Sequence, residues 1–346
     1  MRYLSDRTVR HLRRVAEWPE LGESKYRLLE ELGRGGMGIV YLAEDRILGR
    51  RVALKVLAAG AATPGSVDRL WNEARILARL EHPGIVPIHD AGALPDGRIY
   101  YAMKRVDGKR LDELAPSLSR AERLRAFQRI CEAVAFAHAR GVVHRDLKPE
   151  NVMVGSFGEV LVMDWGVAKA LDGSAGAPPL VAGSARPETT AAGAVIGTLA
   201  YMAPEQAEGA ADRIGAAADV YGLGAILYFL LSGRAPFDGD RAEGRVRGAA
   251  RAEPEPLRRS DSSTPPALEA IVRRAMALEQ DRRYPGAEDL SADVSRYLDG
   301  ERVLAHEEGV LERARRVLVR YRTPILIVLA YVVVRAALIV FGFGRR

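Results

Sequence analysis

The sequence has few of the residues that build disulfide or metal scaffolds. Among its 346 residues there is one cysteine, Cys131, and only 6% of the residues are aromatic. A single cysteine excludes an intrachain disulfide and argues against a zinc cluster built on thiolates. The chain can therefore fold in a reducing compartment. It has to be stabilised by a hydrophobic core, and 48% of its residues are hydrophobic.

The chain has an excess of positive charge, and much of that excess lies in one short segment. The formal net charge is +6 at pH 7, and residues 313–322 contain five arginines and no acidic residue. No RNA- or DNA-binding motif accompanies these charges, so we expect no nucleic-acid partner. Residues 1–25 are polar and rich in arginine, and they lack the apolar run of a signal peptide. We predict that they form an N-terminal extension.

A long apolar run lies near the C-terminus, at residues 325–343, and is apolar except for Arg335. About 20 such residues suffice to cross a bilayer core, so we predict a single transmembrane helix over 323–343. Residues 301–322 would then be a basic juxtamembrane segment, and the positive-inside rule would place the preceding domain in the cytoplasm at the cell membrane. A buried or surface-lying amphipathic helix is the alternative, because Arg335 is costly inside a bilayer.

The pattern over residues 26–106 is mostly that of β-strands. Runs of β-branched and aliphatic residues are separated by turn residues, and only residues 66–80 show apolar residues at helical spacing. The strand-like runs are 26–33, 39–45, 50–57, 85–92 and 98–106.

Residues 107–300 are mainly helical instead. The expected helices are 119–141, 219–232, 265–279 and 287–299, with short strands at 152–155 and 159–164. Residues 172–194 are dominated by small and polar residues and are expected to be mobile. We therefore predict an α+β, bilobal fold, with a small β-rich N-lobe over 26–106 and a larger helical C-lobe over 107–300.

A glycine-rich run of the pattern G-x-G-x-x-G-x-V, residues 33–40, connects the first two predicted strands. Glycines let the backbone approach triphosphate oxygens and present N–H donors to them. A glycine-rich hairpin turn without a ligand is the alternative. A dinucleotide-binding turn is disfavoured, because a strand rather than a helix follows the run.

A lysine, Lys55, stands in the middle of an apolar strand-like run. A buried ammonium is costly unless it meets an anion such as the α- and β-phosphates of a nucleotide. On the next predicted helix Glu73 is the natural second partner, and Glu81 is a weaker one. The alternative is a surface lysine beside a solvated glutamate.

The run HRDLKPEN at residues 144–151 is followed by the run MDWG. Phosphoryl transfer needs an aligned acceptor hydroxyl and screening of the phosphate charge by Mg²⁺. Asp146 can accept or orient the hydroxyl proton, and Lys148 can neutralise the γ-phosphate as it moves. Asn151 and Asp164 offer oxygen ligands suited to Mg²⁺.

On these motifs, in this order, the chain from Tyr26 to about Gly300 resembles the eukaryotic-type (Hanks-type) protein kinase family, most closely its bacterial membrane-anchored Ser/Thr members. The resemblance implies a kinase domain over 26–300 that transfers the γ-phosphoryl group of Mg-ATP to Ser/Thr hydroxyls of proteins in signalling. It implies ATP and Mg²⁺ as cofactors. It also implies that the activity of the domain is set by a helix of the small lobe and by an activation segment.

The resemblance also assigns roles to single residues. The catalytic residues it implies are Asp146, Lys148 and Asn151, and the metal ligands are Asn151 and Asp164. The nucleotide-binding residues it implies are Leu32, Gly33, Gly35, Gly38, Val40, Ala53, Lys55, Glu73, Met103, Val106, Met153 and Asp164.

Scaffold roles carry over in the same way. Glu205 would pair with Arg283, and Asp219 would hold the backbone of the catalytic loop. The residues expected to stack between the lobes are Leu77, Ile88, His144 and Trp165. Trp165 stands where the family has phenylalanine, so we expect the same flip mechanism with different inhibitor preferences.

The substrate class and the switch follow from the resemblance too. Lys148 and Gly197-Thr198 resemble the Ser/Thr class rather than the Tyr class. Arg145, with Lys169, would bind an activation-segment phosphate placed by autophosphorylation, for which a homodimer acting in trans is a possible arrangement. The candidate phosphosites are Thr189 and Thr190, then Ser184 and Ser174, and each can equally be an ordinary loop residue.

Two other functions compete with an active protein kinase. A pseudokinase scaffold would bind nucleotide or partners without transfer, but the motif lysine, aspartates and asparagine are all present. A small-molecule phosphotransferase of the aminoglycoside-kinase type would not need the Ala-Pro-Glu at 203–205 or the Gly-Thr before it, which resemble a surface for an extended polypeptide.

Overall fold

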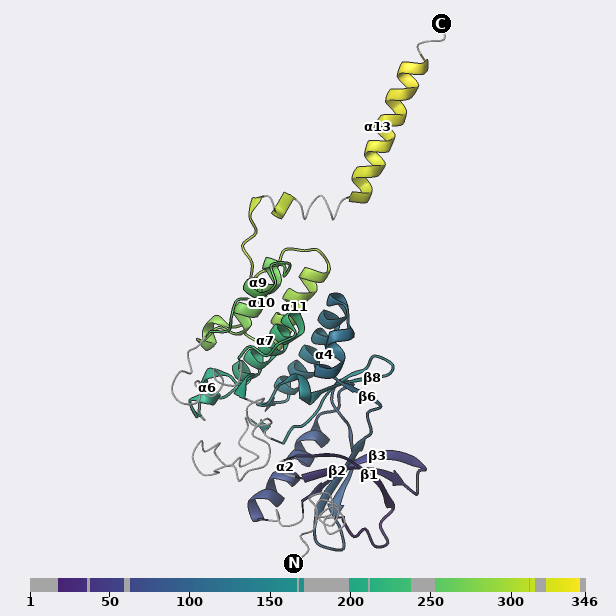
Figure 1. Cartoon of the computed structure of the whole chain (residues 1–346), viewed down its shortest axis with the longest axis vertical. Coiled ribbons are helices and arrows are strands. Elements are labelled where there is room, and N and C mark those ends of the chain that lie inside the picture. Colours follow the sequence, from purple (N-terminus) through teal and green to yellow (C-terminus); the bar gives the residue numbers. More distant parts are fainter. Residues whose placement is uncertain are drawn as a thin grey trace, which may run out of the picture.

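The computed structural model describes most of the chain in two lobes and a separate C-terminal helix (Figure 1). The described residues are 18–35, 38–58, 63–166, 168–170, 199–210, 212–237, 253–310, 312–314 and 322–342. The predicted bilobal α+β fold is confirmed, because a β-sheet with one helix comes first and a helical lobe follows.

The N-lobe is a five-stranded antiparallel sheet with strand order β1-β2-β3-β5-β4. Its strands are β1 (Tyr26–Arg34), β2 (Gly38–Asp45), β3 (Arg50–Leu57), β4 (Ile88–Ala93) and β5 (Ile99–Lys104). Successive side chains of a strand point to opposite faces. Val52 and Val56 of β3 therefore join an outer apolar cluster, whereas Ala53 and Leu57 belong to the core on the other face.

The helix α2 (Pro64–Arg79) packs on that second face, as the helical spacing predicted. Thr63 begins it with a capping box, in which the side chain of Thr63 accepts a hydrogen bond from the Ser66 backbone N–H. Leu70 and Leu77 are buried on its inner side. The inner face of the sheet and α2 thus enclose the N-lobe core.

The outer face of the sheet is covered in part by residues that precede the first strand. The rings of Trp18 and Tyr41 meet edge to face, with centroids 5.3 Å apart, and Leu21 packs against the outer cluster. This covering role was not evident in the sequence of residues 1–25. Residues 1–17 lie outside the described part of the chain.

The C-lobe is built from helices around a small β-sheet region. Its helices are α3 (Leu111–Leu114), η1 (Ala115–Ser117), α4 (Arg120–Ala139), η2 (Pro149–Asn151), α6 (Pro204–Ala207), α7 (Ala216–Ser232), α9 (Leu257–Ser260), α10 (Pro266–Ala275), η4 (Gln280–Arg282) and α11 (Ala287–Leu298). Its strands are β6 (Gly108–Arg110), β7 (Val142–Val143), β8 (Val152–Gly155), β9 (Val160–Val162) and β10 (Lys169–Ala170). Most of α7 is buried, which explains its almost continuous apolar sequence.

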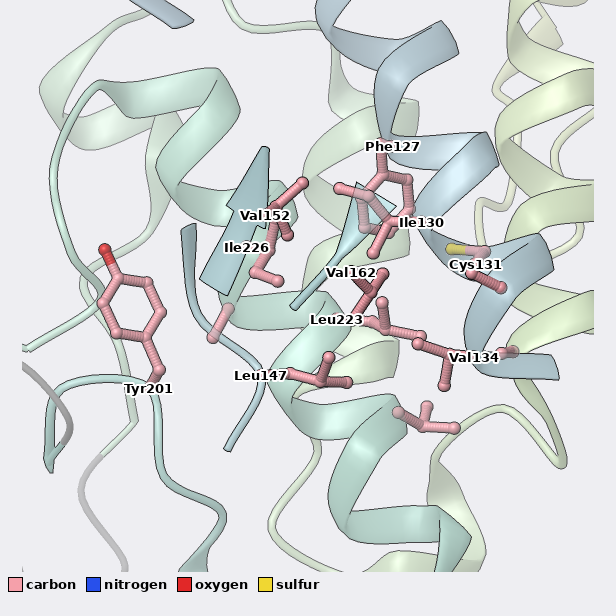
Figure 2. Close-up of a cluster of buried hydrophobic side chains, with 14 of the residues drawn as sticks. Phe127, Ile130, Cys131, Val134, Leu147, Val152, Val162, Tyr201, Leu223 and Ile226 are labelled. Atoms are coloured by element: carbon pink, nitrogen blue, oxygen red, sulfur yellow. The ribbon is translucent and has the colours of Figure 1, made fainter. Parts of the chain in front are cut away.

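The C-lobe core joins the helices to the short strands (Figure 2). Phe127 and Ile130 of α4 and Leu223 of α7 belong to this core, together with Val152 and Val162 of the strands. The loop between β7 and η2 is tied to the same core by Leu147, which is buried. The segment with the HRDLKPEN run therefore rests on a rigid base.

The helix α13 (Arg322–Gly342) forms close to the range predicted for a membrane span, 323–343. It stands away from both lobes in Figure 1, and its described apolar side chains are 56% to 64% exposed. No helix of the described residues, however, is both long enough and apolar enough to cross a membrane. The predicted transmembrane helix is therefore not confirmed. The described centre of α13 carries Arg335, whose guanidinium reaches the Tyr331 hydroxyl at 3.5 Å, and such a charge opposes insertion.

Candidate active site

Three charged side chains, one ammonium and two carboxylates, meet between the lobes. The Lys55 ammonium lies 2.8 and 2.9 Å from the two carboxylate oxygens of Glu73 and 3.4 Å from Oδ1 of Asp164. Lys55 comes from β3, Glu73 from α2, and Asp164 follows β9. These three residues, predicted as one site, are thus brought together by elements from both lobes.

For Lys55 and Asp164 the neighbouring charges outweigh burial in setting the pKa. Burial by itself would lower the pKa of Lys55, but the negative charges of Glu73 and Asp164 outweigh burial and raise the pKa. Enclosure would raise the pKa of Asp164, and the nearby Lys55 ammonium lowers it instead. Lys55 is therefore held as a cation and Asp164 as a carboxylate, which are the forms needed to contact phosphate oxygens and a metal ion.

The catalytic-loop residues form a second group. The Lys148 ammonium lies 3.0 Å from Oδ2 of Asp146. The Asn151 amide donates to the backbone oxygen of Asp146 at 2.8 Å and to its Oδ2 at 3.0 Å. Since the Asn151 amide nitrogen is used in this way, its side-chain oxygen is left as an acceptor. The backbone oxygen of Asn151 also accepts a hydrogen bond from Met163, the residue before Asp164, at 2.8 Å.

The backbone of this loop is strained and firmly held. Arg145 and Asp164 are non-glycine residues with positive φ angles, 70° and 56°, and such conformations persist only where the surroundings enforce them. At Arg145 the buried Asp219 carboxylate does so by accepting the backbone N–H groups of His144 at 2.7 Å and Arg145 at 2.8 Å. His138 Nε2 lies 2.8 Å from the same carboxylate. Burial would raise the pKa of Asp219, but these partners lower it.

The residues predicted to stack between the lobes lie in the core. The rings of His144 and Trp165 are 4.5 Å apart, and Trp165 is completely buried. The Trp165 indole N–H donates to the backbone oxygen of Val162 at 3.3 Å. Leu77 belongs to the same core cluster, and Ile88 packs against it. The larger ring is therefore accommodated with its polar atom paired, as a buried tryptophan requires.

The glycine-rich run forms a hairpin between β1 and β2, in which the Gly35 N–H donates to the backbone oxygen of Gly38 at 2.9 Å. A Cβ at Gly38 would come within 2.5 Å of the backbone oxygen of Val56, so packing alone requires this glycine. A Cβ at Gly33 would meet nothing within 4 Å. Packing does not explain Gly33, and its open surface is free for a ligand. Residues 36–37 lie outside the described part of the chain.

The other residues that the resemblance assigns to nucleotide binding lie along the inner side of the N-lobe sheet and at its base. Ala53 on β3 and Met103 on β5 are directly opposite each other in the ladder, and both are buried. Val40 and Val106 are half-buried against the same core. The remaining two predicted positions are Met153, half-buried on β8, and Leu32, 48% exposed on β1.

The Ala-Pro-Glu segment is anchored in the C-lobe. The Arg283 guanidinium forms two hydrogen bonds with the Glu205 carboxylate, at 2.8 and 2.9 Å, and both side chains are buried. Gln206, which the sequence analysis did not single out, donates to the backbone oxygen of Arg145 at 2.7 Å. The end of the activation segment is thus tied directly to the catalytic loop.

Several predicted residues cannot be placed. Residues 171–198 and the side chain of Lys169 lie outside the described part of the chain. The candidates affected are Ser174, Ser184, Thr189, Thr190, Gly197 and Thr198. Among the described residues, Nε of Arg145 is buried and has no hydrogen-bond partner.

A metal ion would need ligands from outside the protein. Among the described residues, no group of three or more His, Cys, Asp or Glu side chains could hold a metal ion. Asn151 and Asp164 provide two oxygen ligands, and Mg²⁺ commonly completes its shell with water and substrate phosphate oxygens. The residues present therefore fit a magnesium ion that arrives with a nucleotide.

The sequence of the chain matches a known family and several known proteins. A family model described as "Protein kinase domain" matches residues 26–293. The serine/threonine-protein kinase PknB of Mycolicibacterium smegmatis is 38% identical over 290 residues, which cover 82% of this chain and 44% of that protein. For PrkC of Bacillus subtilis the identity is 36% over 284 residues, covering 81% and 41%. The chain spans less than half the length of these curated relatives.

A solved structure agrees with the fold. The PknI kinase domain of Mycobacterium tuberculosis superimposes with a TM-score of 0.59 at 26% identity, covering 79% of this chain and 96% of that domain. The chain belongs to the protein kinase family, and the relatives it resembles are bacterial serine/threonine-protein kinases.

Proposed function

We propose that the chain is an active Ser/Thr protein kinase that transfers the γ-phosphoryl group of Mg-ATP to Ser and Thr hydroxyls of proteins. The main support is the contact between Lys55, Glu73 and Asp164, because it joins both lobes around a site for phosphates. The kinase domain would occupy residues 26–300, between an N-terminal extension at 1–25 and a basic segment at 301–322.

The protein's part in the reaction is to position and to neutralise. Lys55 would contact the α- and β-phosphates while Glu73 orients it. Bound Mg²⁺, held by Asn151 and Asp164, would screen the charge of the phosphate oxygens. Asp146 would orient the substrate hydroxyl and take its proton. As the hydroxyl oxygen bonds to the γ-phosphorus, the bond to the bridging oxygen breaks and ADP leaves.

Lys148 and Asn151 prepare Asp146 for this role. Both donate to Oδ2 of Asp146, so among the described residues Oδ1 is the oxygen left for the incoming hydroxyl. Lys148, at 3.0 Å from Asp146, is close enough to the reacting group to neutralise charge that moves onto the transferred phosphoryl group.

A transfer assay with radiolabelled ATP and a generic protein acceptor tests the proposal. Asp146→Asn keeps the size and removes the carboxylate, so we expect a loss of at least 100-fold in kcat with nucleotide binding retained. If neither the acceptor nor the kinase is labelled, the result favours a pseudokinase scaffold. Labelling of an aminoglycoside but no protein would favour a small-molecule phosphotransferase.

Autophosphorylation of the activation segment is a further part of the proposal. Nε of Arg145 is buried without a partner, and an unpaired buried donor is costly until an acceptor arrives. A phosphate within residues 184–198 would supply acceptor oxygens and a charge of about −1.5 to −2. Replacing Thr189 and Thr190 together by alanine is expected to lower the activity, and full activity in that variant would reject these sites.

Attachment to a membrane and dimerisation are also proposals. Along α13 the exposed apolar side chains need a cover, and a bilayer beside the arginines of residues 313–322 would provide one, with the kinase domain in the cytoplasm. Release into the soluble fraction after lysis without detergent would oppose membrane attachment.

Ile47 and Leu48 are exposed on the turn between β2 and β3 and offer an apolar contact for a second copy in trans-autophosphorylation.

A further inference from the structure

The register of the N-lobe sheet places a tyrosine beside the nucleotide-site lysine. β3 and β5 are antiparallel, and Tyr101 of β5 is directly opposite Lys55 of β3. Side chains at directly opposite positions share one face of a sheet and lie close together. Tyr101 therefore points to the face covered by α2, and its neighbour Tyr100 points to the other face.

The hydroxyl of Tyr101 binds the same carboxylate as Lys55. It donates to Oε1 of Glu73 at 2.8 Å, in a fully buried contact, and Tyr101 is only 2% exposed. The Lys55 ammonium lies 5.7 Å from the centre of the Tyr101 ring. The Glu73 carboxylate thus accepts three hydrogen bonds, two from Lys55 and one from Tyr101.

The Tyr101 hydroxyl keeps its proton at neutral pH and so remains a donor. Burial and the negative charge of Glu73 raise the pKa of Tyr101 well above its ordinary value. If α2 moved away from the sheet, Glu73 would lose this bond and the hydroxyl would be left buried without a partner. Removing one partner of a buried hydrogen bond to a charged group has a larger cost than removing an exposed one.

The packing of α2 does not fix the helix on every side. A groove of about 380 Å³ lies between α2 and β4, lined by Trp71 and Ala74 of the helix and by Ile88 and Ala91 of the strand. The helix therefore has room to shift on that side. Specific contacts to Glu73, rather than close packing all round, must hold it in place.

We propose that Tyr101 is a positioning residue that holds Glu73, and with it α2, in the arrangement that orients Lys55. Tyr101 acts through Glu73 and does not touch the substrate. The proposal rests on the proposed kinase function for its effect on catalysis. It means that this kinase carries, within its own sheet, a contact that favours the ordered position of α2 before any activating partner or phosphate acts.

The competing explanation is that Tyr101 merely fills the core. Phenylalanine would fill the same space, so Tyr101→Phe removes the hydroxyl alone. Tyr100→Phe is the matched control, because the Tyr100 hydroxyl also faces a carboxylate, Asp90 at 3.5 Å, but on the opposite face of the sheet.

The experiment measures kcat and KM for ATP in full-length Tyr101→Phe, Tyr100→Phe, Glu73→Gln and the double variant of Tyr101 and Glu73. We expect Tyr101→Phe to lower kcat/KM for ATP about tenfold, with the KM for the protein acceptor unchanged, and Tyr100→Phe to change it less than twofold. In the Glu73→Gln background the tyrosine change should cost less than twofold, because its partner is already altered.

Amide hydrogen exchange supplies a readout that does not need catalysis. Tyr101→Phe should speed exchange in α2 but not in α4. Equal losses with and without Glu73, or wild-type rates and wild-type exchange in Tyr101→Phe, would overturn the proposal. If the wild type transfers no phosphate, the proposed function fails, and the exchange of α2 still decides the role of Tyr101.

Discussion

Each lobe contains a buried pair of a carboxylate and a cation, and the two pairs are held differently. The closest nitrogen–oxygen distance is 2.8 Å both for Lys55–Glu73 in the N-lobe and for Glu205–Arg283 in the C-lobe. The Arg283 side chain is completely buried and also donates to backbone oxygens of Ala277, Ala217 and Leu278. The Lys55 side chain is 12% exposed and also contacts Asp164, whose side chain is 48% exposed.

The Glu205–Arg283 pair is therefore a fixed structural contact, whereas the Lys55–Glu73 pair can break and form again. A guanidinium with bidentate and backbone hydrogen bonds is fixed in one geometry, whereas an ammonium is a point charge on a flexible chain. If its cation is removed, Glu205 has no route to water. Glu73 is also buried, but the helix α2 that carries it borders a groove and has room to move once the ion pair is broken. Loss of each cation should therefore have different consequences for stability and for activity.

The largest effect on stability is expected for Arg283→Met. Removing one partner of a buried ion pair leaves an uncompensated charge and costs about 3–5 kcal/mol. Thermal unfolding of the full chain measures the loss. Arg282→Met is the matched control, since the Arg282 side chain is 75% exposed, and it should change the free energy of unfolding by less than about 0.5 kcal/mol.

The same pair gives a dependence on pH. Burial by itself would raise the pKa of Glu205, but Arg283 lowers the pKa below 4.5. A carboxyl whose pKa is lower in the folded state contributes stability above the unfolded pKa and loses it as the pH falls. The wild type should lose this contribution on acidification, and Arg283→Met should lack it. Parallel pH curves for the two proteins would contradict the anchor role.

For Lys55→Met we expect a large loss of activity and only a small loss of stability. Loss of the ammonium removes a charge that stabilises the phosphates, so kcat/KM for ATP should fall by about 10²–10³-fold. Because α2 borders a groove and can adjust its position, the free energy of unfolding should change by less than about 2 kcal/mol. A loss of stability equal to that of Arg283→Met would show that the N-lobe pair is as fixed as the C-lobe pair.

The sequence predicted both pairs because each member lies in a short motif with a known chemical role. It predicted the two lobes for a similar reason, since strand-like and helical runs are separated along the chain. The glycine positions were also predicted together, but the structure distinguishes Gly38, required by the backbone of β3, from Gly33, whose surface is open.

Contacts that depend on register or on distant packing were missed. Tyr101 lies opposite Lys55 only once β3 and β5 are paired, and Gln206 meets Arg145 only when the helix α6 packs on the catalytic loop. Asp293 of α11 likewise accepts the backbone N–H groups of Leu304 at 2.8 Å and Ala305 at 3.0 Å. That contact fixes residues just beyond the predicted end of the domain at 300, and no local pattern in the sequence marks it.

The smallest effects are expected for removal of the N-cap side chains of α4 and α2, two helices that begin with capping boxes. Ser119 caps α4 in the C-lobe core, and Thr63 caps α2. Ser119→Ala should lower the free energy of unfolding by about 1 kcal/mol. Thr63→Ala should instead speed amide exchange at the start of α2 with little change in global stability, because a helix that can move opens locally before the lobe unfolds. An equal effect of both changes on global unfolding would mean that α2 is as firmly packed as α4.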